Sequence, residues 1–420
     1  MLCIQDPSYE NSIYLHETLL TECLDSLNGA GAYAFATKDG IDLIFGDNNF
    51  KDFLKNGIYT LVVGTDDITN EHAINTLIKF QKKYKGHLQV KAYVHDAKGS
   101  TFHPKFSWFK KQNGGVLVLG SGNLTQKGLR HNREIYNVVQ QSKKEINEVI
   151  ETWDSWYAHS APFLFDIDDP IVMTKAKQNS AKNFAVSSAK ASIKKELKLK
   201  QEEPELSNLY KKQSKDIHHS TKKEDNNIDV GQKRKDGLID ISSPAIDEDF
   251  DIDFSYWKFD RDASVLVAEL PGKENSRMGQ ANFSKEVFRN YFGAREKEDG
   301  KSYRILLKYV DVDGNLGETE IRPAVISTSH NFRFELKGAK DMVTGANGRR
   351  TIAIFVKVAN RDFMYTLLSS THDDYDNVLS LLPTKRKDNE CRRVNFSIDE
   401  IYKATPKLKI WSRLEKEEKE

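Results

Sequence analysis

Residues 102–109 read Phe-His-Pro-Lys-Phe-Ser-Trp-Phe, and residues 116–123 read Val-Leu-Val-Leu-Gly-Ser-Gly-Asn. The first stretch alternates apolar and polar residues, which predicts a half-buried strand with His103 and Lys105 on one face. The second stretch begins with an apolar run, which predicts a neighbouring buried strand. Its last four residues predict a turn, and glycine-flanked turns let backbone and short side chains approach a phosphate closely.

The residue types in these stretches meet the needs of phosphodiester cleavage. A phosphodiester repels nucleophiles because its oxygens are negative, so an enzyme without a metal needs a nucleophile, donors for the developing charge and an acid for the leaving oxygen. His103, Lys105, Ser121 and Asn123 together supply groups of these kinds. Glu134 begins the next apolar segment, and a carboxylate there is expected to orient the imidazole. For Ser121 and Glu134, an ordinary turn serine and a plain surface carboxylate stay open as alternatives.

This ordered set resembles the phospholipase D superfamily, whose motif is His-x-Lys followed by a Gly-Ser-x-Asn turn. The superfamily's usual Asp, five residues after the motif lysine, is replaced by Lys110, and Glu134 follows Asn123 by eleven residues. These departures resemble the metal-independent restriction endonucleases of the BfiI and NgoFVII type. The similar region runs from the start of the chain to about residue 160.

The resemblance implies a specific mechanism. Such a site needs two histidines, and the chain has one His-x-Lys motif. The resemblance therefore implies a homodimer through the N-terminal domain with one shared site. One His103 forms a covalent phosphohistidine, the second copy's His103 acts as acid and then base, Lys105 and Asn123 hold phosphate oxygens, and Ser121 supports the turn. It implies neither a metal nor another cofactor.

Composition limits the classes of function. The 420 residues predict two or three domains, and 63 basic against 62 acidic residues give a net charge of +1. Any DNA binding would therefore depend on local basic patches. The three cysteines are too scattered for a metal cluster or a disulfide framework, which favours a reducing cytoplasm. No apolar run reaches the length of a membrane span, so a membrane location is not expected.

Periodicity predicts an α/β N-terminal domain with a mixed sheet flanked by helices over residues 1–175. The expected helices cover residues 13–27, 71–82 and 144–157, and the expected strands cover residues 33–36, 60–63, 90–94, 102–109, 116–119 and 135–139. Residues 176–245 predict a charged linker. Its acidic end, continuing to residue 253, is either a plug for the catalytic cleft or a solvated spacer.

Residues 246–420 contain short apolar runs separated by turn signals, which predict a mainly β domain, either a barrel or a sandwich. The pattern resembles the B3-type DNA-recognition domain, a pseudobarrel that accompanies this type of nuclease. Arginine can bind guanine, and asparagine or glutamine can bind adenine, in the major groove. The candidate DNA-binding residues are Lys273, Asn275, Ser276, Arg277, Gln280, Asn331, Arg333, Arg349 and Arg350. For each of them, an ordinary solvated loop side chain is the alternative.

The expected function is a site-specific restriction endonuclease that acts on double-stranded DNA in restriction–modification and phage defence. Some nucleases of this kind work with a helicase-like translocase and a cognate methyltransferase, so the resemblance admits both as partners. Two alternatives stay open. One is a phospholipase or phosphatidyltransferase of the same superfamily, and the other is a catalytically inactive DNA-binding defence scaffold.

Overall fold

The computed structural model describes residues 1–9, 11–96, 99–197, 256–271, 280–297, 301–326, 332–339, 349–385 and 391–414. Met1–Lys182 and Asp251–Glu420 form one compact unit, whose two segments we call the N-terminal and C-terminal halves; Asn183–Phe250 form a second unit. The acidic segment 236–253 and most of the linker expected at 176–245 lie outside the described residues.

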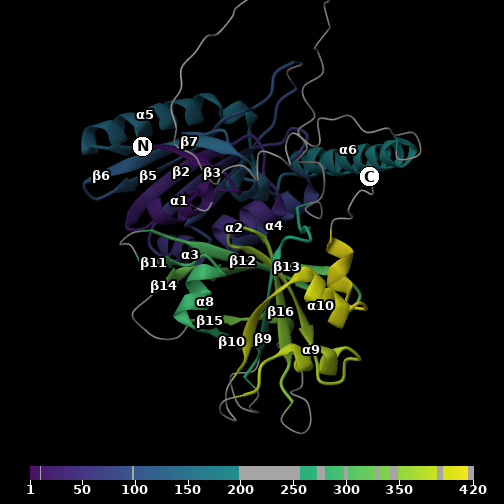
Figure 1. The fold of residues 1–420 in the computed structure, drawn as a ribbon. Coiled ribbons are helices and arrows are strands. Elements are labelled where there is room, and N and C mark those ends of the chain that lie inside the picture. Colours follow the sequence, from purple (N-terminus) through teal and green to yellow (C-terminus); the bar gives the residue numbers. More distant parts are fainter. Residues whose placement is uncertain are drawn as a thin grey trace, which may run out of the picture. The chain divides into compact units, whose positions relative to one another are not determined.

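The N-terminal half contains an eight-stranded mixed sheet with the strand order β1-β7-β6-β5-β2-β3-β4-β8 (Figure 1). Strands β2, β3 and β4 are parallel, and the other neighbours are antiparallel. The mixed sheet expected from the sequence is therefore present. The strands are β1 (Leu2–Gln5), β2 (Ser26–Tyr33), β3 (Ile58–Gly64), β4 (Leu88–Tyr93), β5 (Lys105–Lys111), β6 (Gly114–Gly120), β7 (Glu134–Gln141) and β8 (Leu164–Asp166).

Helices cover both faces of this sheet (Figure 1). On β5, Trp108 packs with Ile146 and Trp153 of α5, whereas Phe109 joins the core on the opposite face with α1, α2 and α4. Trp108 and Phe109 lie on opposite faces because successive side chains of a strand point to opposite sides of the sheet. Helix α5 begins with a capping box between Ser142 and Glu145. The helices are α1 (Leu15–Glu22), α2 (Lys38–Phe45), α3 (Asn48–Phe53), α4 (Glu71–Lys83), the π-helix η1 (Lys127–His131), α5 (Lys143–His159), the short η2 (Ala161–Phe163) and α6 (Pro170–Leu197).

Two expected boundaries were wrong. The helix expected over residues 13–27 ends at Glu22, and the strand expected over residues 33–36 is β2, which begins at Ser26. The first part of this strand was not predicted, because it contains Gly29 and Gly31 and glycine has a low strand propensity. They are needed there: a Cβ on Gly29 would lie 2.7 Å from the carbonyl oxygen of Trp108, and one on Gly31 would lie 2.9 Å from that of Phe106.

The C-terminal half is mainly β. Among its described residues, the largest sheet has six strands in the order β13-β12-β17-β16-β9-β18, and β10-β15 and β11-β14 form two-stranded sheets. The described strands do not close into a barrel, so the pseudobarrel expected for this half is not observed among them. The strands are β9 (Ser264–Glu269), β10 (Gln280–Phe283), β11 (Arg295–Glu296), β12 (Arg304–Val310), β13 (Leu316–Pro323), β14 (Val325–Ile326), β15 (Phe332–Glu335), β16 (Ile352–Ala359), β17 (Asp362–Leu368) and β18 (Arg393–Ser397).

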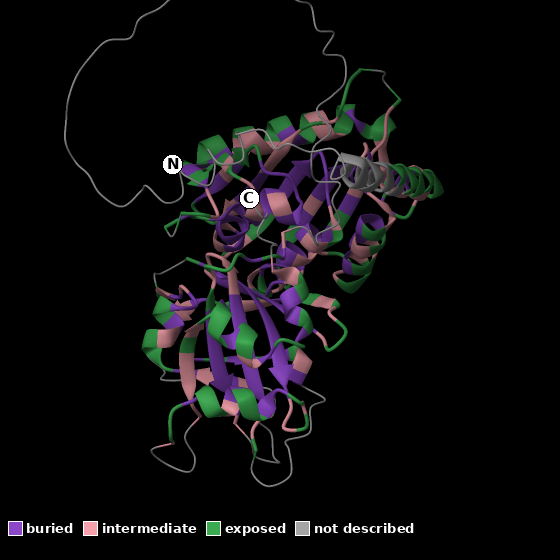
Figure 2. Ribbon diagram, turned by 45° about the vertical axis from the view of Figure 1, so that its right-hand side comes forward, coloured by how far each residue is buried: buried purple, intermediate pink, exposed green. Residues whose placement is uncertain are grey.

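The six-stranded sheet is buried on both faces in its central strands (Figure 2). All seven residues of β17 are buried. On β16, Ile354 and Phe355 belong to two different hydrophobic clusters, one for each face. The helical elements of this half are α8 (Lys285–Asn290), η4 (Lys337–Ala339), α9 (Tyr375–Leu381), α10 (Ile398–Ala404) and η6 (Lys409–Arg413).

Candidate functional site

His103 and Lys105 lie where the chain enters β5. The strand begins at Lys105, so His103 belongs to the preceding loop and not to the strand expected over residues 102–109. The Nζ atom of Lys105 lies 3.0 Å from Nε2 and 3.1 Å from Nδ1 of His103. Pro104 between them has no N–H, but its carbonyl oxygen accepts a hydrogen bond from the Ala34 N–H at 2.8 Å. The imidazole and the ammonium are therefore adjacent at one edge of the sheet.

The glycine-flanked turn follows β6 at the same edge. Phe106 pairs with Leu119, so the start of β5 lies beside the end of β6. Asn123 is buried, and its Oδ1 accepts a hydrogen bond from the Phe35 N–H at 3.3 Å. Because a backbone N–H holds the carbonyl end of this side chain, its amide nitrogen is the end that can donate to a ligand.

Ser121 and Glu134 are in direct contact. The Ser121 hydroxyl donates to the Glu134 carboxylate, which also accepts a hydrogen bond from Asn132 Nδ2 at 3.2 Å. The Ser121 hydroxyl accepts from the Ile135 N–H at 3.1 Å, and the Ser121 N–H donates to the Ile135 carbonyl oxygen at 3.0 Å. The hydrogen bond between Ser121 and Glu134 therefore links the turn to the first residue of β7. Orientation of His103 by Glu134 stays a prediction.

A cavity of about 1280 Å³ opens beside His103 and Lys105. It lies between the sheet and α5, and Gly120 also lines it. Aromatic side chains form much of the remaining wall, namely Tyr93, Phe102, Phe106, Trp108, Trp153, Trp156 and Phe163. His103 and Lys105 therefore lie beside a largely apolar cavity.

A second histidine, His95, lines the same cavity and lies outside the motifs described above. His95 Nε2 lies 3.2 Å from Asp66 Oδ2, and the same oxygen accepts a hydrogen bond from the Phe102 N–H at 3.2 Å. His95 follows β4 and Asp66 follows β3, two neighbouring parallel strands. Polar residues directly after adjacent parallel strands are the sequence signal that could have found this pair.

Buried hydroxyl groups hold β5 from the face opposite the cavity. The Ser107 hydroxyl lies 2.8 Å from those of both Tyr33 and Tyr59. Burial raises the pKa of Tyr33 to about 12, so this hydroxyl stays neutral. Three neutral hydroxyl groups therefore support the strand that begins at Lys105.

The candidate DNA-binding residues are only partly described. Lys273, Asn275, Ser276, Arg277 and Asn331 lie outside the described residues. Gln280 of β10 pairs with Glu335 of β15, the strand that also carries the exposed Arg333. Arg349 is ion-paired with Asp376 at 2.8 Å, and Arg350 lies two residues before the start of β16. The structure thus brings Gln280 and Arg333 to one small sheet.

Other features of the described residues concern metals, cysteines and membranes. No three side chains of His, Cys, Asp or Glu gather there in a metal-binding group. Cys3, Cys23 and Cys391 are free thiols, and the first two are buried. Of the described helices, none combines the length and the apolar character required to cross a membrane.

The chain matches no protein-family model and no curated protein. Several solved structures show similarity. NucT from Helicobacter pylori is 15% identical over 36% of this chain and 88% of its own, with a TM-score of 0.26. Nuc from Salmonella typhimurium, a phospholipase D family member, is 16% identical over 40% of this chain and 95% of its own, with a TM-score of 0.29. Phosphatidylserine synthase from Haemophilus influenzae is 12% identical over 46% of each chain, with a TM-score of 0.28.

Proposed function

We propose that this protein is a metal-independent, site-specific restriction endonuclease that hydrolyses DNA phosphodiesters through a phosphohistidine. One observation carries the proposal: the Lys105 ammonium lies 3.0 Å from a ring nitrogen of His103, at the sheet edge where β6 ends in the glycine-flanked turn. A nucleophile, a cation and an amide donor at one edge are the groups that phosphoryl transfer requires.

The reaction has two steps. A ring nitrogen of His103 attacks the phosphorus, the bond to the leaving oxygen breaks, and a second imidazole protonates that oxygen. A water molecule, deprotonated by the same second imidazole, then attacks phosphorus and releases His103. Lys105 and the Asn123 amide stabilise the negative charge that develops on the phosphate oxygens. Ser121 and Glu134 hold the turn from which Asn123 projects.

In this proposal, the second imidazole is His103 of a second copy of the chain. An apolar patch near the site supports a homodimer: Leu119, Ile135 and Ile4 are 42%, 50% and 64% exposed. Ile4 pairs directly with Ile135, and these residues lie on the face of the sheet that bears the cavity. Contiguous exposed apolar side chains commonly mark a protein interface.

The C-terminal half is proposed to read the DNA sequence as a B3-like domain. Its mainly β character and the exposed Arg333 are compatible with that role. The proposed substrate is double-stranded DNA, and a translocase and a methyltransferase are the further partners implied by the resemblance.

The decisive experiment is digestion of unmethylated genomic DNA by the full chain in EDTA, followed by sequencing of the ends. Cleavage at one recurrent sequence is the expected result. His103→Ala should abolish cleavage and leave DNA binding intact. Wild-type protein that binds DNA but never cuts it would identify a scaffold, and hydrolysis of phosphatidylcholine vesicles in a parallel assay would identify a phospholipase.

A further inference from the structure

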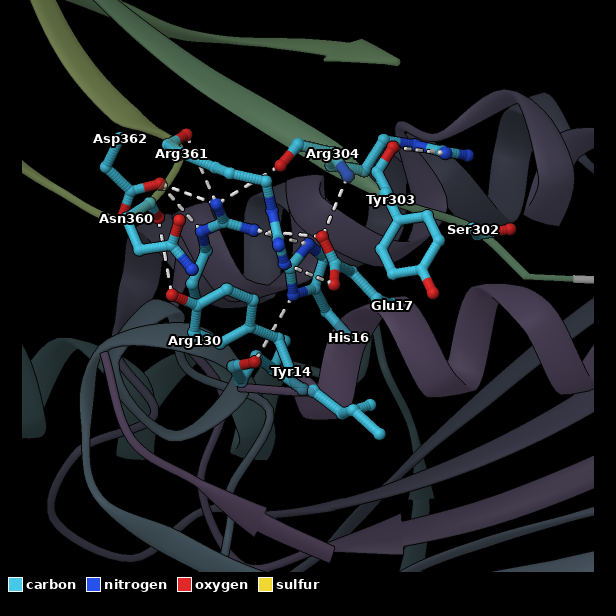
Figure 3. Close-up of polar contacts among 12 residues, drawn as sticks. Tyr14, His16, Glu17, Arg130, Ser302, Tyr303, Arg304, Asn360, Arg361 and Asp362 are labelled. Atoms are coloured by element: carbon cyan, nitrogen blue, oxygen red, sulfur yellow. Dashed lines mark hydrogen bonds and ion pairs between the residues drawn. The ribbon is translucent and has the colours of Figure 1, made fainter. Parts of the chain in front are cut away.

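A cluster of buried charged residues joins the two halves of the first compact unit (Figure 3). Arg130 of η1 is completely buried, and its Nη2 lies 2.7 Å from Oδ1 of Asp362, the first residue of β17. Arg361 Nη2 lies 2.8 Å from Oε2 of Glu17 in α1. Two carboxylates and two guanidinium groups therefore balance one another without access to water.

Backbone groups and neutral side chains complete the cluster. Arg130 donates to the carbonyl oxygens of Arg304 at 3.2 Å and Arg361 at 3.3 Å, and Tyr256 donates to Asp362 Oδ2 at 2.6 Å. His16 donates through Nδ1 to the Leu129 carbonyl oxygen and accepts from Arg130 through Nε2, both at 3.3 Å. The neutral form of His16 has one donor and one acceptor, so it fits this position.

Stability alone is a weak reason for such a cluster. Removing charges from water costs several kcal/mol per ion, and well-packed apolar residues are often as stabilising as a buried ion pair. Buried pairs do fix one geometry, because their distances and angles are restricted. The cluster is therefore expected to fix the geometry of the segments that contact it.

The cluster holds the π-helix that follows the phosphate-binding turn. Helix η1 (Lys127–His131) lies between Asn123 and Glu134 in the sequence. Its Gly128 packs so closely on Asn123 that an added Cβ would be 2.6 Å from the Asn123 backbone nitrogen. The next residue after η1 is Asn132, which donates to Glu134. Both ends of η1 are thus in contact with residues of the candidate site.

We infer that Asp362, in the C-terminal half, is a positioning residue for the phosphate site, and that it acts through Arg130 and η1 on Asn123 and Glu134. The inference rests on the proposed function for its catalytic consequence. The chain of contacts runs from Asp362 to Arg130 and then along two residues of backbone to Gly128. Loss of the Asp362 carboxylate leaves Arg130 buried without its main counter-ion, so η1 must shift or loosen.

Asp47→Asn is the matched control for Asp362→Asn. Asp47 pairs with Arg304 through two hydrogen bonds of 2.6 and 2.8 Å, and both side chains are buried. This pair also joins the two halves, but Asp47 caps α3 and not η1. Both variants remove one carboxylate charge from a buried pair without changing side-chain size.

The first measurement is hydrogen exchange of the full chain, followed by mass spectrometry, which needs no enzymatic activity. Asp362→Asn should accelerate amide exchange across residues 120–134, and Asp47→Asn should leave exchange there as in the wild type. Unchanged exchange in Asp362→Asn would overturn the inference, whether or not the protein cuts DNA. If Asp362→Asn does not fold, Arg130→Lys is the second variant. Lysine keeps the positive charge but lacks the planar guanidinium group, so this variant should show the same faster amide exchange across residues 120–134.

The second measurement is single-turnover cleavage at saturating DNA. Asp362→Asn should lower the rate constant about 100-fold, the order expected from a displacement of about 1 Å in a site. Its DNA dissociation constant should match that of Asp47→Asn. Equal rate constants for the two variants would refute a positioning role. Absence of cleavage by wild-type protein would refute the proposed function instead and leave the exchange result valid.

Discussion

Arg130 and Asp362 form a completely buried ion pair, although 232 positions separate them in the sequence. Arg130 follows Asn123 of the glycine-flanked turn by seven residues, whereas Asp362 is the first residue of a central strand of a different sheet. The geometry of the candidate site therefore depends on residues of both halves. A motif confined to residues 103–134 contains the proposed reacting groups but not all of the residues that hold them in place.

Mixed dimers will identify the acid. If His103 of the second copy protonates the leaving oxygen, a dimer of one wild-type and one His103→Ala chain has no complete site, and its activity should fall at least about 100-fold, the usual contribution of a general acid. The measurement is cleavage by heterodimers purified through two different tags. Activity near half that of the wild type would instead assign the acid to the same chain, where His95 lines the cavity with His103.

Ile135→Asp should produce monomers without activity. Ile135 is 50% exposed beside Ile4 on the proposed dimer face, and a carboxylate there would have to lose its water on association. Sedimentation velocity measures the change in mass. Val312→Asp is the control, because Val312 is also exposed but lies in the turn between β12 and β13. A dimeric, active Ile135→Asp protein would exclude this face as the interface.

Gly128→Ala should damage both stability and activity. The new Cβ would lie 2.6 Å from the Asn123 nitrogen and 2.8 Å from its carbonyl oxygen, so backbone must move. Overpacking of this kind costs about 1–3 kcal/mol. Urea unfolding and DNA cleavage measure the two effects. At Gly317 the nearest atoms are 3.5 Å away, and Gly317→Ala should change neither quantity.

Stability should decrease as the pH falls below about 6.5. Burial lowers the pKa of His16 and His131 from the ordinary value of 6.5, so below that pH the unfolded chain binds protons that the folded chain excludes. Each histidine contributes a slope of at most about 1.4 kcal/mol per pH unit. Urea unfolding between pH 8 and pH 5 measures the slope, and His16→Gln should make it shallower. An identical slope in that variant would contradict the assignment to His16.

A second loss of stability is expected at lower pH. Burial by itself would raise the pKa of Asp362, but Arg130 and His131 hold it far below the ordinary 3.8. Its stabilising contribution is therefore complete above about pH 4 and decreases as the pH falls further. The loss should be smaller in Asp362→Asn, which lacks this carboxyl group, although other carboxyl groups with lowered pKa values, such as that of Glu269, still titrate. Acid unfolding monitored by circular dichroism measures the difference.

Local patterns in the sequence predicted most of the elements near the site but little of what connects them. The alternation over residues 102–109 predicted β5, and the stripe of apolar residues predicted α5 with one or two residues of error at each end. Strand β17 was not predicted, and neither was its contact with η1. Periodicity reports which face of an element is buried, whereas contacts between distant segments depend on how the elements pack.

The π-helix has a consequence for how sequences of this kind can vary in length. Each residue turns the chain by about 100° in an α-helix and by a smaller angle in a π-helix, so deleting one residue from Lys127–His131 would rotate the Arg130 side chain away from β17. Gly128, Leu129 and Arg130 are buried, so this segment accepts neither insertions nor deletions. Natural variants that keep the link between the halves should therefore keep a constant spacing from Asn123 to Glu134.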